Sequence, residues 1–277
     1  MKKNKLSILL VCLLVLMLTA CGSDSSNGSN DENNSSDQSK KVLRIVTDAA
    51  YAPMEYMDKE EVTGFGIEFI RAVAEEAGYE AKVEHVGWDP LFVEVESGRA
   101  DLAVSSISIT EERKLKYEFS VPYYLSTNKI LVPENSTITS SADLKDKTVA
   151  VLGGSTGMIA AEKILGTNSK DIKKFESNVL AIQELKKKGA DAVVADNAVV
   201  EEYAKNNPDD HFVVVEDASF DEEYYGVLFP KENTELRDEF NEAINTVFDN
   251  GTYAEIYEEW FGETPDIEKL KAQQTNS

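Results

Sequence analysis

The stretches GRADLAV, residues 98–104, and GADAVV, residues 189–194, decide the fold, because they are near copies at two distant places in the chain. Each follows a segment with the periodicity of an amphipathic helix, and each leads into an apolar strand. A helix that ends at glycine before a short apolar strand is typical of α/β proteins. The repetition therefore predicts two similar lobes rather than one continuous sheet.

The first copy lies within a region that alternates strands and helices. We expect strands at residues 42–46, 82–86 and 101–109, and helices at residues 67–77 and 91–97. Gly98 is expected to close the second helix.

The second copy lies within the same pattern. We expect strands at residues 147–152 and 191–194, a turn at residues 153–157, and helices at residues 158–165 and 178–188. Gly189 is expected to close the last of these helices. Two later segments, residues 234–250 and 253–261, carry apolar stripes and are assigned to the first lobe as helices.

Two extended stretches, residues 123–131 and 223–229, are predicted to cross between the lobes. Two crossings form a hinge, and a cleft between hinged lobes is where a small ligand is expected. We therefore predict an α/β, two-lobed fold. Lobe 1 would contain residues 41–125 and 226–272, and lobe 2 would contain residues 126–225.

The start of the chain has the pattern of an export signal. Residues 1–5 are basic, and residues 6–18 form an apolar run too short to span a bilayer core, which needs roughly 20 residues. Small residues then precede Cys21, an arrangement that resembles the bacterial lipobox, in which the cysteine becomes the lipidated first residue of the mature chain. An ordinary signal peptide with an incidental cysteine is the alternative.

The segment after that cysteine, up to residue 40, is expected to be a flexible tether. Residues 22–39 contain no aliphatic or aromatic side chain, so they cannot bury enough apolar surface to offset the entropy of ordering. We predict that residues 1–20 are a lipoprotein signal peptide and that residues 21–40 are a lipidated tether.

Charge and cysteine content exclude several classes of function. The formal net charge is −23, and loss of residues 1–20, with three lysines and no acid, takes it to −26. Nucleic-acid binding is disfavoured because the phosphate backbone repels such a surface. Cys12 would leave with the signal and Cys21 would carry lipid, which excludes a thiol nucleophile, a thiolate metal site and a disulfide. We expect no metal and no cofactor.

Ligands in open α/β sheets lie beyond the carboxyl ends of the strands. The residues expected at these ends are Asp48, Tyr51, Trp88, residues 105–113, the turn at residues 153–157, and Asp196. They combine one basic group, two acids, hydroxyls, two aromatic rings and a glycine-rich turn before a helix. Such a set suits a zwitterion.

Several motifs, in this order, resemble the bacterial solute-binding proteins of family 3, the polar amino-acid-binding proteins of ABC importers. They are TDAAYAP at 47–53, GFGIEF at 64–69, SSISITEER at 105–113, GSTG at 154–157 and YG at 225–226. The resemblance covers residues 43–270 and implies the type II periplasmic-binding-protein-like fold.

Two other stretches, WDPLF at residues 88–92 and DNAV at 196–199, are most similar to the arginine/lysine/histidine-binding members. Gly66 departs from the family pattern, which usually has an acid there. We expect this difference to alter packing within the lobe more than ligand contact.

The resemblance implies which residues bind the ligand's carboxylate. Arg113 would grip it through two parallel hydrogen bonds. The alternative is a surface arginine in a helix capped by Thr110. Ser108 would add a hydroxyl, and Thr156 would close on the same carboxylate together with the backbone N–H groups that open its helix.

The resemblance also implies a site for the α-ammonium and one for the side chain. Asp196 would pair with the ammonium, helped by the Ser106 carbonyl, unless its role is to cap the following helix. Asp48 would pair with a distal cation held between the rings of Tyr51 and Trp88. Alternatively, the rings are ordinary core aromatics and Asp48 is a turn acid.

Glu55 is a second candidate acid for the side-chain pocket. His85 and His211 fall in or beside predicted strands, away from the strand ends, so structural roles are expected for both. The chain has no HExxH motif, no His/Asp/Glu cluster with metal-ligand spacing and no nucleophile elbow.

The implied function is that of an extracytoplasmic lipoprotein, anchored to the outer face of the cell membrane, which captures a free L-amino acid. A basic amino acid is expected, and an ABC permease and ATPase would receive it. We expect a monomer without catalytic activity. Three alternatives remain open: a glutamine or general polar amino-acid receptor, a dehydratase-like enzyme on the same fold, and a sensor that signals through a separate membrane partner.

Overall fold

The computed structural model describes residues 40–274. The expected signal peptide and Cys21 lie outside these residues, as does all of the expected tether except Lys40. Between Lys40 and Gln274, no helix combines the length and the apolar character that a membrane span requires.

Lobe 1 is built on a mixed sheet with the strand order β5-β1-β6-β14-β7. Its strands are β1 (Lys41–Thr47), β5 (Tyr79–His85), β6 (Leu102–Ala103), β7 (Tyr117–Phe119) and β14 (Leu228–Pro230). Both neighbours of β1 are parallel to it, whereas β14 is antiparallel to β6 and β7.

Six helices belong to lobe 1: α1 (Phe65–Glu76), α2 (Trp88–Glu96), α3 (Glu111–Lys114), α7 (Thr234–Asp249), α8 (Thr252–Phe261) and α9 (Ile267–Gln274). A small antiparallel sheet of β2 (Ala50–Tyr51), β3 (Glu55–Asp58) and β4 (Glu61–Thr63) lies between β1 and α1 in the chain. Its strands have two to four residues each and were not predicted.

Lobe 2 repeats this plan. Its sheet has the order β10-β9-β11-β8-β12. The strands are β8 (Tyr124–Pro133), β9 (Val149–Leu152), β10 (Ile172–Phe175), β11 (Ala192–Asp196) and β12 (Phe212–Val215). The helices are α4 (Thr156–Leu165), α5 (Asn178–Lys186) and α6 (Asn197–Asn206), with 3₁₀ turns η1 (Ser141–Leu144) and η2 (Pro208–Asp210).

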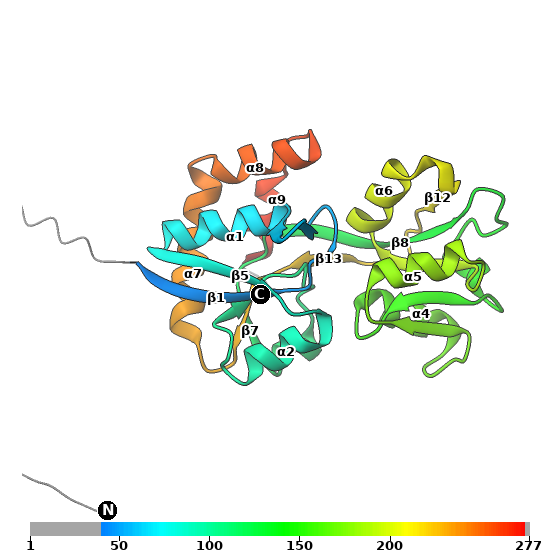
Figure 1. The fold of residues 1–277 in the computed structure, drawn as a ribbon, viewed down its shortest axis with the longest axis horizontal. Coiled ribbons are helices and arrows are strands. Elements are labelled where there is room, and N and C mark those ends of the chain that lie inside the picture. Colours follow the sequence, from blue (N-terminus) through cyan, green and yellow to red (C-terminus); the bar gives the residue numbers. More distant parts are fainter. Residues whose placement is uncertain (1–39, 275–277) are drawn as a thin grey trace, which may run out of the picture. The chain divides into compact units, whose positions relative to one another are not determined.

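The chain crosses between the lobes on β8 and on β13 (Glu222–Tyr225), which pair with each other in antiparallel fashion (Figure 1). These two strands form the hinge. They match the two extended stretches expected from the sequence, and the α/β, two-lobed fold is confirmed.

The repeated sequence has the same structural role in both lobes. In each copy the strand lies between a parallel central strand and an antiparallel strand. Asp101 accepts a hydrogen bond from the backbone N–H of Arg44 at 2.7 Å and donates its own N–H to the carbonyl of Arg44. Asp191 makes the same two bonds with Thr148, the first at 2.8 Å. The echo therefore reflects one structural unit used twice.

Several expected element boundaries are wrong: β5 and α2 each begin three residues earlier than expected, and two further cases have a cause in the backbone. The strand expected at 101–109 ends at Ala103, because Ser106 has a left-handed backbone (φ 49°) and the following residues turn to the hinge. The helix expected at 178–188 and closed by Gly189 ends at Lys186. Lys188, and not Gly189, takes a left-handed conformation after it (φ 62°), and a Cβ on Gly189 would lie 2.1 Å from the Glu184 carboxylate.

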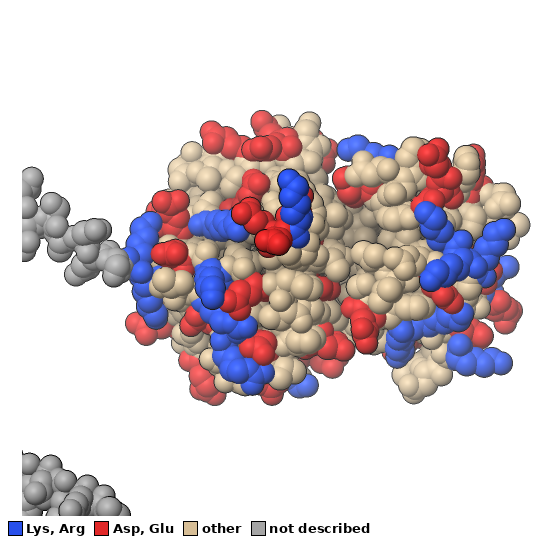
Figure 2. All heavy atoms as spheres, in the orientation of Figure 1, with Lys and Arg blue, Asp and Glu red and all other residues tan. Residues whose placement is uncertain are grey.

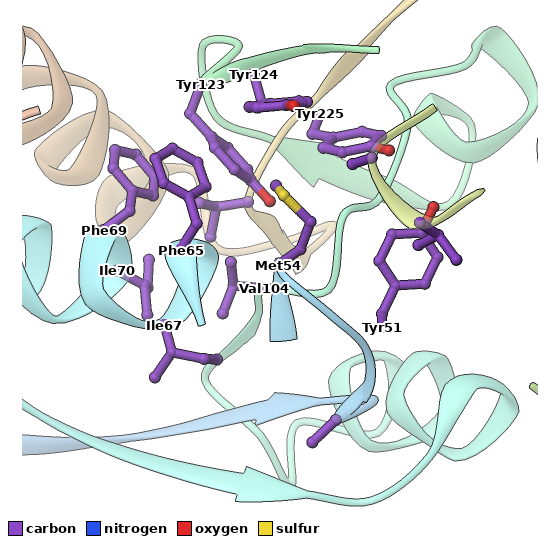
Figure 3. Packing of buried hydrophobic residues seen from close by; sticks show 14 of the residues in the cluster. Tyr51, Met54, Phe65, Ile67, Phe69, Ile70, Val104, Tyr123, Tyr124 and Tyr225 are labelled. Carbon is purple, nitrogen blue, oxygen red and sulfur yellow. The ribbon is translucent and has the colours of Figure 1, made fainter. Parts of the chain in front are cut away.

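An aromatic cluster fixes the hinge to lobe 1. The rings of Tyr124 on β8 and Tyr225 on β13 stack with centroids 5.4 Å apart (Figure 3). Tyr123 stacks on Phe69 of α1 at 4.7 Å, and its carbonyl accepts a hydrogen bond from the Tyr253 hydroxyl. The base of the hinge is therefore packed against lobe 1.

Charged side chains of both signs are scattered over the face of the protein shown in Figure 2, with uncharged surface between them. Many are paired at the surface, for example Arg44 with Glu84 and Glu94. Arg44 and its two partners are half-buried, whereas pairs that are fully exposed contribute little to stability.

Candidate ligand-binding site

A small cavity of about 20 Å³, which is room for about one water molecule, lies between the lobes, beyond the carboxyl ends of the strands. Lobe 1 contributes Tyr51, Trp88, Ser105, Ser106, Ser108 and Arg113, and lobe 2 contributes Leu152, Ser155, Thr156, Asn178, Ala195 and Asp196. The structure thus brings together seven of the eight ligand residues expected from the sequence. The eighth, Asp48, does not line this cavity.

Arg113 projects from α3, a single turn that is capped by Thr110, as expected. Its guanidinium donates to the carbonyl of Ser108 at 2.8 Å and to the carbonyl of Gly154, in lobe 2, at 3.2 Å. The side chain therefore spans the cleft rather than lying on the surface.

Two aromatic rings and two carboxylates lie near the guanidinium of Arg113. The guanidinium carbon lies 5.4 Å from the centre of the Trp88 ring and 5.7 Å from that of Phe92. Burial lowers the pKa of Arg113, and the nearby carboxylates of Asp196 and Glu223 oppose that shift. A planar cation held on aromatic rings is suited to binding a carboxylate.

Asp196 is the last residue of β11 and lies on the other side of the cavity. Its Oδ2 atom accepts hydrogen bonds from the hydroxyls of Tyr51 and Tyr225, each at 2.5 Å. Burial raises the pKa of Asp196 to about 6, and the nearby Glu223 carboxylate adds to the shift. Its side chain makes no cap hydrogen bond to α6, so capping does not explain this acid.

The glycine-rich turn opens α4 toward the cavity. Ser155, which the sequence reasoning did not single out, is the N-cap, because its hydroxyl accepts from the N–H of Met158. Thr156 is the first helical residue. Gly157 permits a close approach to β11, since a Cβ there would lie 2.6 Å from the carbonyl of Val194.

Glu55 lies behind the cavity wall and does not line it. It is fully buried, and the Ser106 hydroxyl donates to both of its oxygens. Burial raises its pKa to about 8, and the charges of Asp48 and Asp196 act in the same direction. The side chain of Ser106 is therefore engaged, which leaves its backbone for ligand contact.

Gly66 makes room for that buried acid. A Cβ at this position would lie 2.3 Å from Glu55 Oε1. The departure from the family pattern thus concerns packing inside lobe 1, consistent with the expectation from the sequence.

Asp48 is buried at the end of β1, with its backbone N–H donating to Ser105 Oγ. Within residues 40–274 its carboxylate accepts no hydrogen bond. Burial raises the pKa of Asp48, and His85 partly opposes the shift. The Nδ1 atom of His85 accepts from the N–H of Ala49 and lies 3.8 Å from Asp48 Oδ1.

The expectation that His85 lies away from the strand ends is therefore wrong, because it is the last residue of β5. His211 lies beside β12 with a left-handed backbone, and its side chain is exposed and 3.5 Å from Glu134. His211 has no part in the cavity.

The two aromatic residues line the cavity in different ways. Trp88 is the first residue of α2, not the end of a strand, and its ring lies under Arg113. Tyr51 uses its hydroxyl on Asp196, so this bond joins the two lobes. Both rings line the cavity, and a cation held between them stays a prediction.

Asn178 was missed by the sequence reasoning. It begins α5, is only 3 % exposed and lines the cavity, and its Oδ1 atom has no hydrogen-bond partner among residues 40–274. A single asparagine at a helix start gives no local signal of such a role. In the part of the chain that the structure describes, no group of His, Cys, Asp and Glu side chains could hold a metal ion.

Residues 43–263 match the sequence profile of the bacterial extracellular solute-binding proteins, family 3. The chain belongs to this family. The resemblance inferred from the motifs is thereby confirmed, and so is an extracytoplasmic location.

Relatives of this family 3 protein are binding proteins. It is 36% identical over 223 residues to a probable histidine-binding protein of Neisseria gonorrhoeae, covering 80% of this chain and 83% of the relative. It is 33% identical over 264 residues to the arginine-binding extracellular protein ArtP of Bacillus subtilis, covering 94% and 98%.

A solved structure agrees with the sequence relatives. The arginine-, lysine-, histidine-binding protein ArtJ of Geobacillus stearothermophilus superposes with a TM-score of 0.81 at 46% identity, covering 83% of this chain and all of that one. These matches confirm the prediction of amino-acid binding for ABC transport without catalysis, and they leave the dehydratase hypothesis with little support.

Proposed function

We propose that this protein is the receptor of an ABC importer for a basic amino acid, arginine, lysine or histidine. The observation that carries the proposal is that Arg113 and Asp196 line one small cavity from opposite lobes. A cation and an anion across a gap match the two charged ends of an amino acid. Relatives that bind arginine and histidine support the choice of ligand.

The carboxylate end would lie at Arg113. The guanidinium now donates to the Gly154 carbonyl across the cleft, and a ligand carboxylate would take over that donor. Ser108 and Thr156, with the first N–H groups of α4, complete the subsite. The ligand thus replaces a weak contact between the lobes with a charged one.

The ammonium end would lie at Asp196. Both tyrosine hydroxyls bind Oδ2, so Oδ1 is left without a donor from the described residues. An ammonium at Oδ1 and at the Ser106 carbonyl would satisfy that oxygen. It would also lower the raised pKa of Asp196, because a positive charge favours the ionised carboxylate.

The side-chain end is proposed to lie among Tyr51, Trp88 and Asn178. Asp48 remains the proposed partner of a distal cation, although the cavity must extend past Ser105 for direct contact. Asp48 and Asp196 can make this side of the cleft negative, whereas Glu55, with its pKa raised to about 8, holds a proton at neutral pH. A second positive charge on the ligand is favoured there.

Both lobes contribute residues to the proposed site, and this division explains how a ligand would favour closure of the lobes. Each lobe contributes to both charged ends, so a bound ligand would add contacts to the closed state beyond the direct bonds of Tyr51 to Asp196 and of Arg113 to Gly154. We further propose that acyl chains on Cys21 anchor the protein outside the cell membrane, that residues 21–40 act as the tether, and that a monomer presents both lobes to the permease and ATPase.

A thermal-shift screen of the full-length chain against the twenty amino acids tests the proposal. A ligand at 100 times its Kd should stabilise the protein by about 2.7 kcal/mol. The basic amino acids should give the largest shifts. No shift with any amino acid would refute the receptor function.

A glutamine or general polar amino-acid receptor is the second candidate. The buried Asn178 amide lines the cavity whereas Asp48 does not, and an amide pairs well with an amide. Asp48→Asn separates the two ligand classes. If a basic ligand is bound, this variant should lose arginine and lysine binding but keep neutral ligands. Unchanged calorimetric affinity for arginine would refute the role of Asp48.

A further inference from the structure

Glu223 is a carboxylate of the hinge that binds a residue of the proposed carboxylate subsite. Its Oε2 atom accepts a hydrogen bond from the Ser108 hydroxyl at 2.6 Å. Its Oε1 atom accepts from the side-chain amide of Asn128, on the other hinge strand, also at 2.6 Å. One acid thus connects β13, β8 and the loop that precedes α3.

Backbone pairing holds this arrangement in place. Ile109 donates its N–H to the carbonyl of Tyr224, and Gly226 donates to the carbonyl of Ile107. Ser108 therefore lies on a loop that is joined to the hinge strand on both sides of it. Glu223 cannot leave Ser108 by a simple movement of the loop, and only its side chain is free to turn away.

The charge of Glu223 acts on both ends of the site. It raises the pKa of Asp196 and opposes the lowering of the pKa of Arg113. A carboxylate placed between Arg113, Ser108 and Thr156 would be close to this fixed negative charge. Repulsion between the ligand's carboxylate and the nearby Glu223 carboxylate would weaken binding, because a partly buried site screens charges less than water does.

We propose that Glu223 competes with the ligand's carboxylate for Ser108 and thereby sets the affinity and selectivity of the site. Glu223 holds the hydroxyl that the ligand's carboxylate would need. Binding of an amino acid requires Ser108 to exchange one carboxylate for another, whereas a ligand without a carboxylate leaves the Glu223–Ser108 bond intact. The proposal rests on the proposed function, because it assumes that the carboxylate lies at Arg113.

Calorimetry with L-arginine and L-argininamide tests the proposal on the full-length chain. In Glu223→Gln the affinity for L-arginine should rise roughly tenfold, because one like-charge contact is removed. The affinity for the amide should stay the same or fall. Glu222→Gln is the matched control, since Glu222 is the preceding residue, is exposed and pairs with Lys269. It should change neither affinity more than twofold.

A second variant separates the hydroxyl from the charge. Glu223→Asp keeps the charge but shortens the reach to Ser108, and should raise L-arginine affinity by less than the glutamine variant does. In a Ser108→Ala background the gain from Glu223→Gln should shrink. An equal change for both ligands, or a loss of L-arginine affinity in Glu223→Gln, would overturn the proposal. Failure of the unsubstituted protein to bind L-arginine would instead refute the proposed basic ligand.

Discussion

The two lobes share a topology but not a chemistry. In each, the helix that precedes the repeated stretch leads into a strand whose entering aspartate makes the same two backbone bonds, Asp101 in lobe 1 and Asp191 in lobe 2. Beyond that point they diverge. In lobe 2 the strand continues to Asp196 at the cavity, whereas in lobe 1 it stops at Ala103.

The difference shows how one structural unit acquires two opposite roles. After Ala103 the chain of lobe 1 turns at Ser106 and is held by the hinge strand, and it then reaches Arg113. A cation thus comes from an irregular loop, and an anion from a regular strand end. The repeated unit positions both groups, while the segments that follow it decide their charge.

The largest expected difference between the lobes concerns the buried acid Glu55 of lobe 1, whose pKa is raised further than that of Asp196 in lobe 2. Its pKa is raised from 4.5 to about 8, so the folded protein binds a proton that the unfolded chain has released. The unfolding free energy should therefore fall as the pH rises from about 5 to 8, by about 3 kcal/mol. Denaturation of the ligand-free chain at several pH values measures this slope.

Glu55→Gln provides the control for that measurement. In the variant, most of the decrease in unfolding free energy above pH 6 should be absent. The variant should be more stable than the unsubstituted protein at pH 8. Asp196 has a pKa of about 6, so it also lowers the unfolding free energy as the pH rises toward 6. The variant should therefore keep a smaller dependence of unfolding free energy on pH. An unchanged slope in the variant would show that Glu55 is ionised in the fold.

Equivalent glycines near the starts of α1 and α4 give the next comparison. Gly157→Ala places a methyl group 2.6 Å from the backbone carbonyl of Val194, and should cost about 2 kcal/mol of unfolding free energy. Gly66→Ala meets the end of the Glu55 side chain instead, and should cost about 1 kcal/mol.

Denaturant titration measures both losses of unfolding free energy. Helix propensity alone would predict that both variants are more stable, because alanine favours helices over glycine by up to about 1 kcal/mol. Truncation of Glu55 to alanine should relieve the cost of Gly66→Ala in a double-mutant cycle but not that of Gly157→Ala. Relief in both lobes would contradict the packing described for α4.

The smallest expected effects test the repeat itself. Asp101→Ala and Asp191→Ala each remove one acceptor of a backbone N–H and should each cost about 1 kcal/mol. The cost should be slightly lower in lobe 2, where the bond is exposed. Asparagine keeps the acceptor at either position and should restore most of the stability. A large effect in one lobe and none in the other would show that the echo has no common structural role.

Much of the fold was predictable because its signals are local. The repeat, the apolar periodicities and the two extended crossings identified both sheets and the hinge. The β2–β4 hairpin was missed because its strands are very short and include charged residues such as Glu55 and Asp58. The early end of β6 was missed because the left-handed backbone of Ser106 and the bonds of its loop to β13 depend on residues more than a hundred positions away.

The site was predictable where a motif carried it. Arg113, Thr156 and Asp196 lie at the cavity as expected. Asn178 and Glu223 gave no signal, because their roles arise from contacts that only the tertiary structure creates. Asp48 was assigned to the cavity from its strand end, yet Ser105 and Ser106 line the wall there instead.

The central claim is that Arg113 of lobe 1 and Asp196 of lobe 2 bind opposite ends of one amino acid. Calorimetry at pH 7.5 with L-arginine, L-argininamide and Nα-acetyl-L-arginine tests it on Arg113→Ala and Asp196→Asn. Arg113→Ala should lose the preference for L-arginine over the amide and keep that over the acetylated form, and Asp196→Asn should do the reverse. If both variants lose both preferences equally, or neither variant loses either, the two residues do not divide the ligand between them.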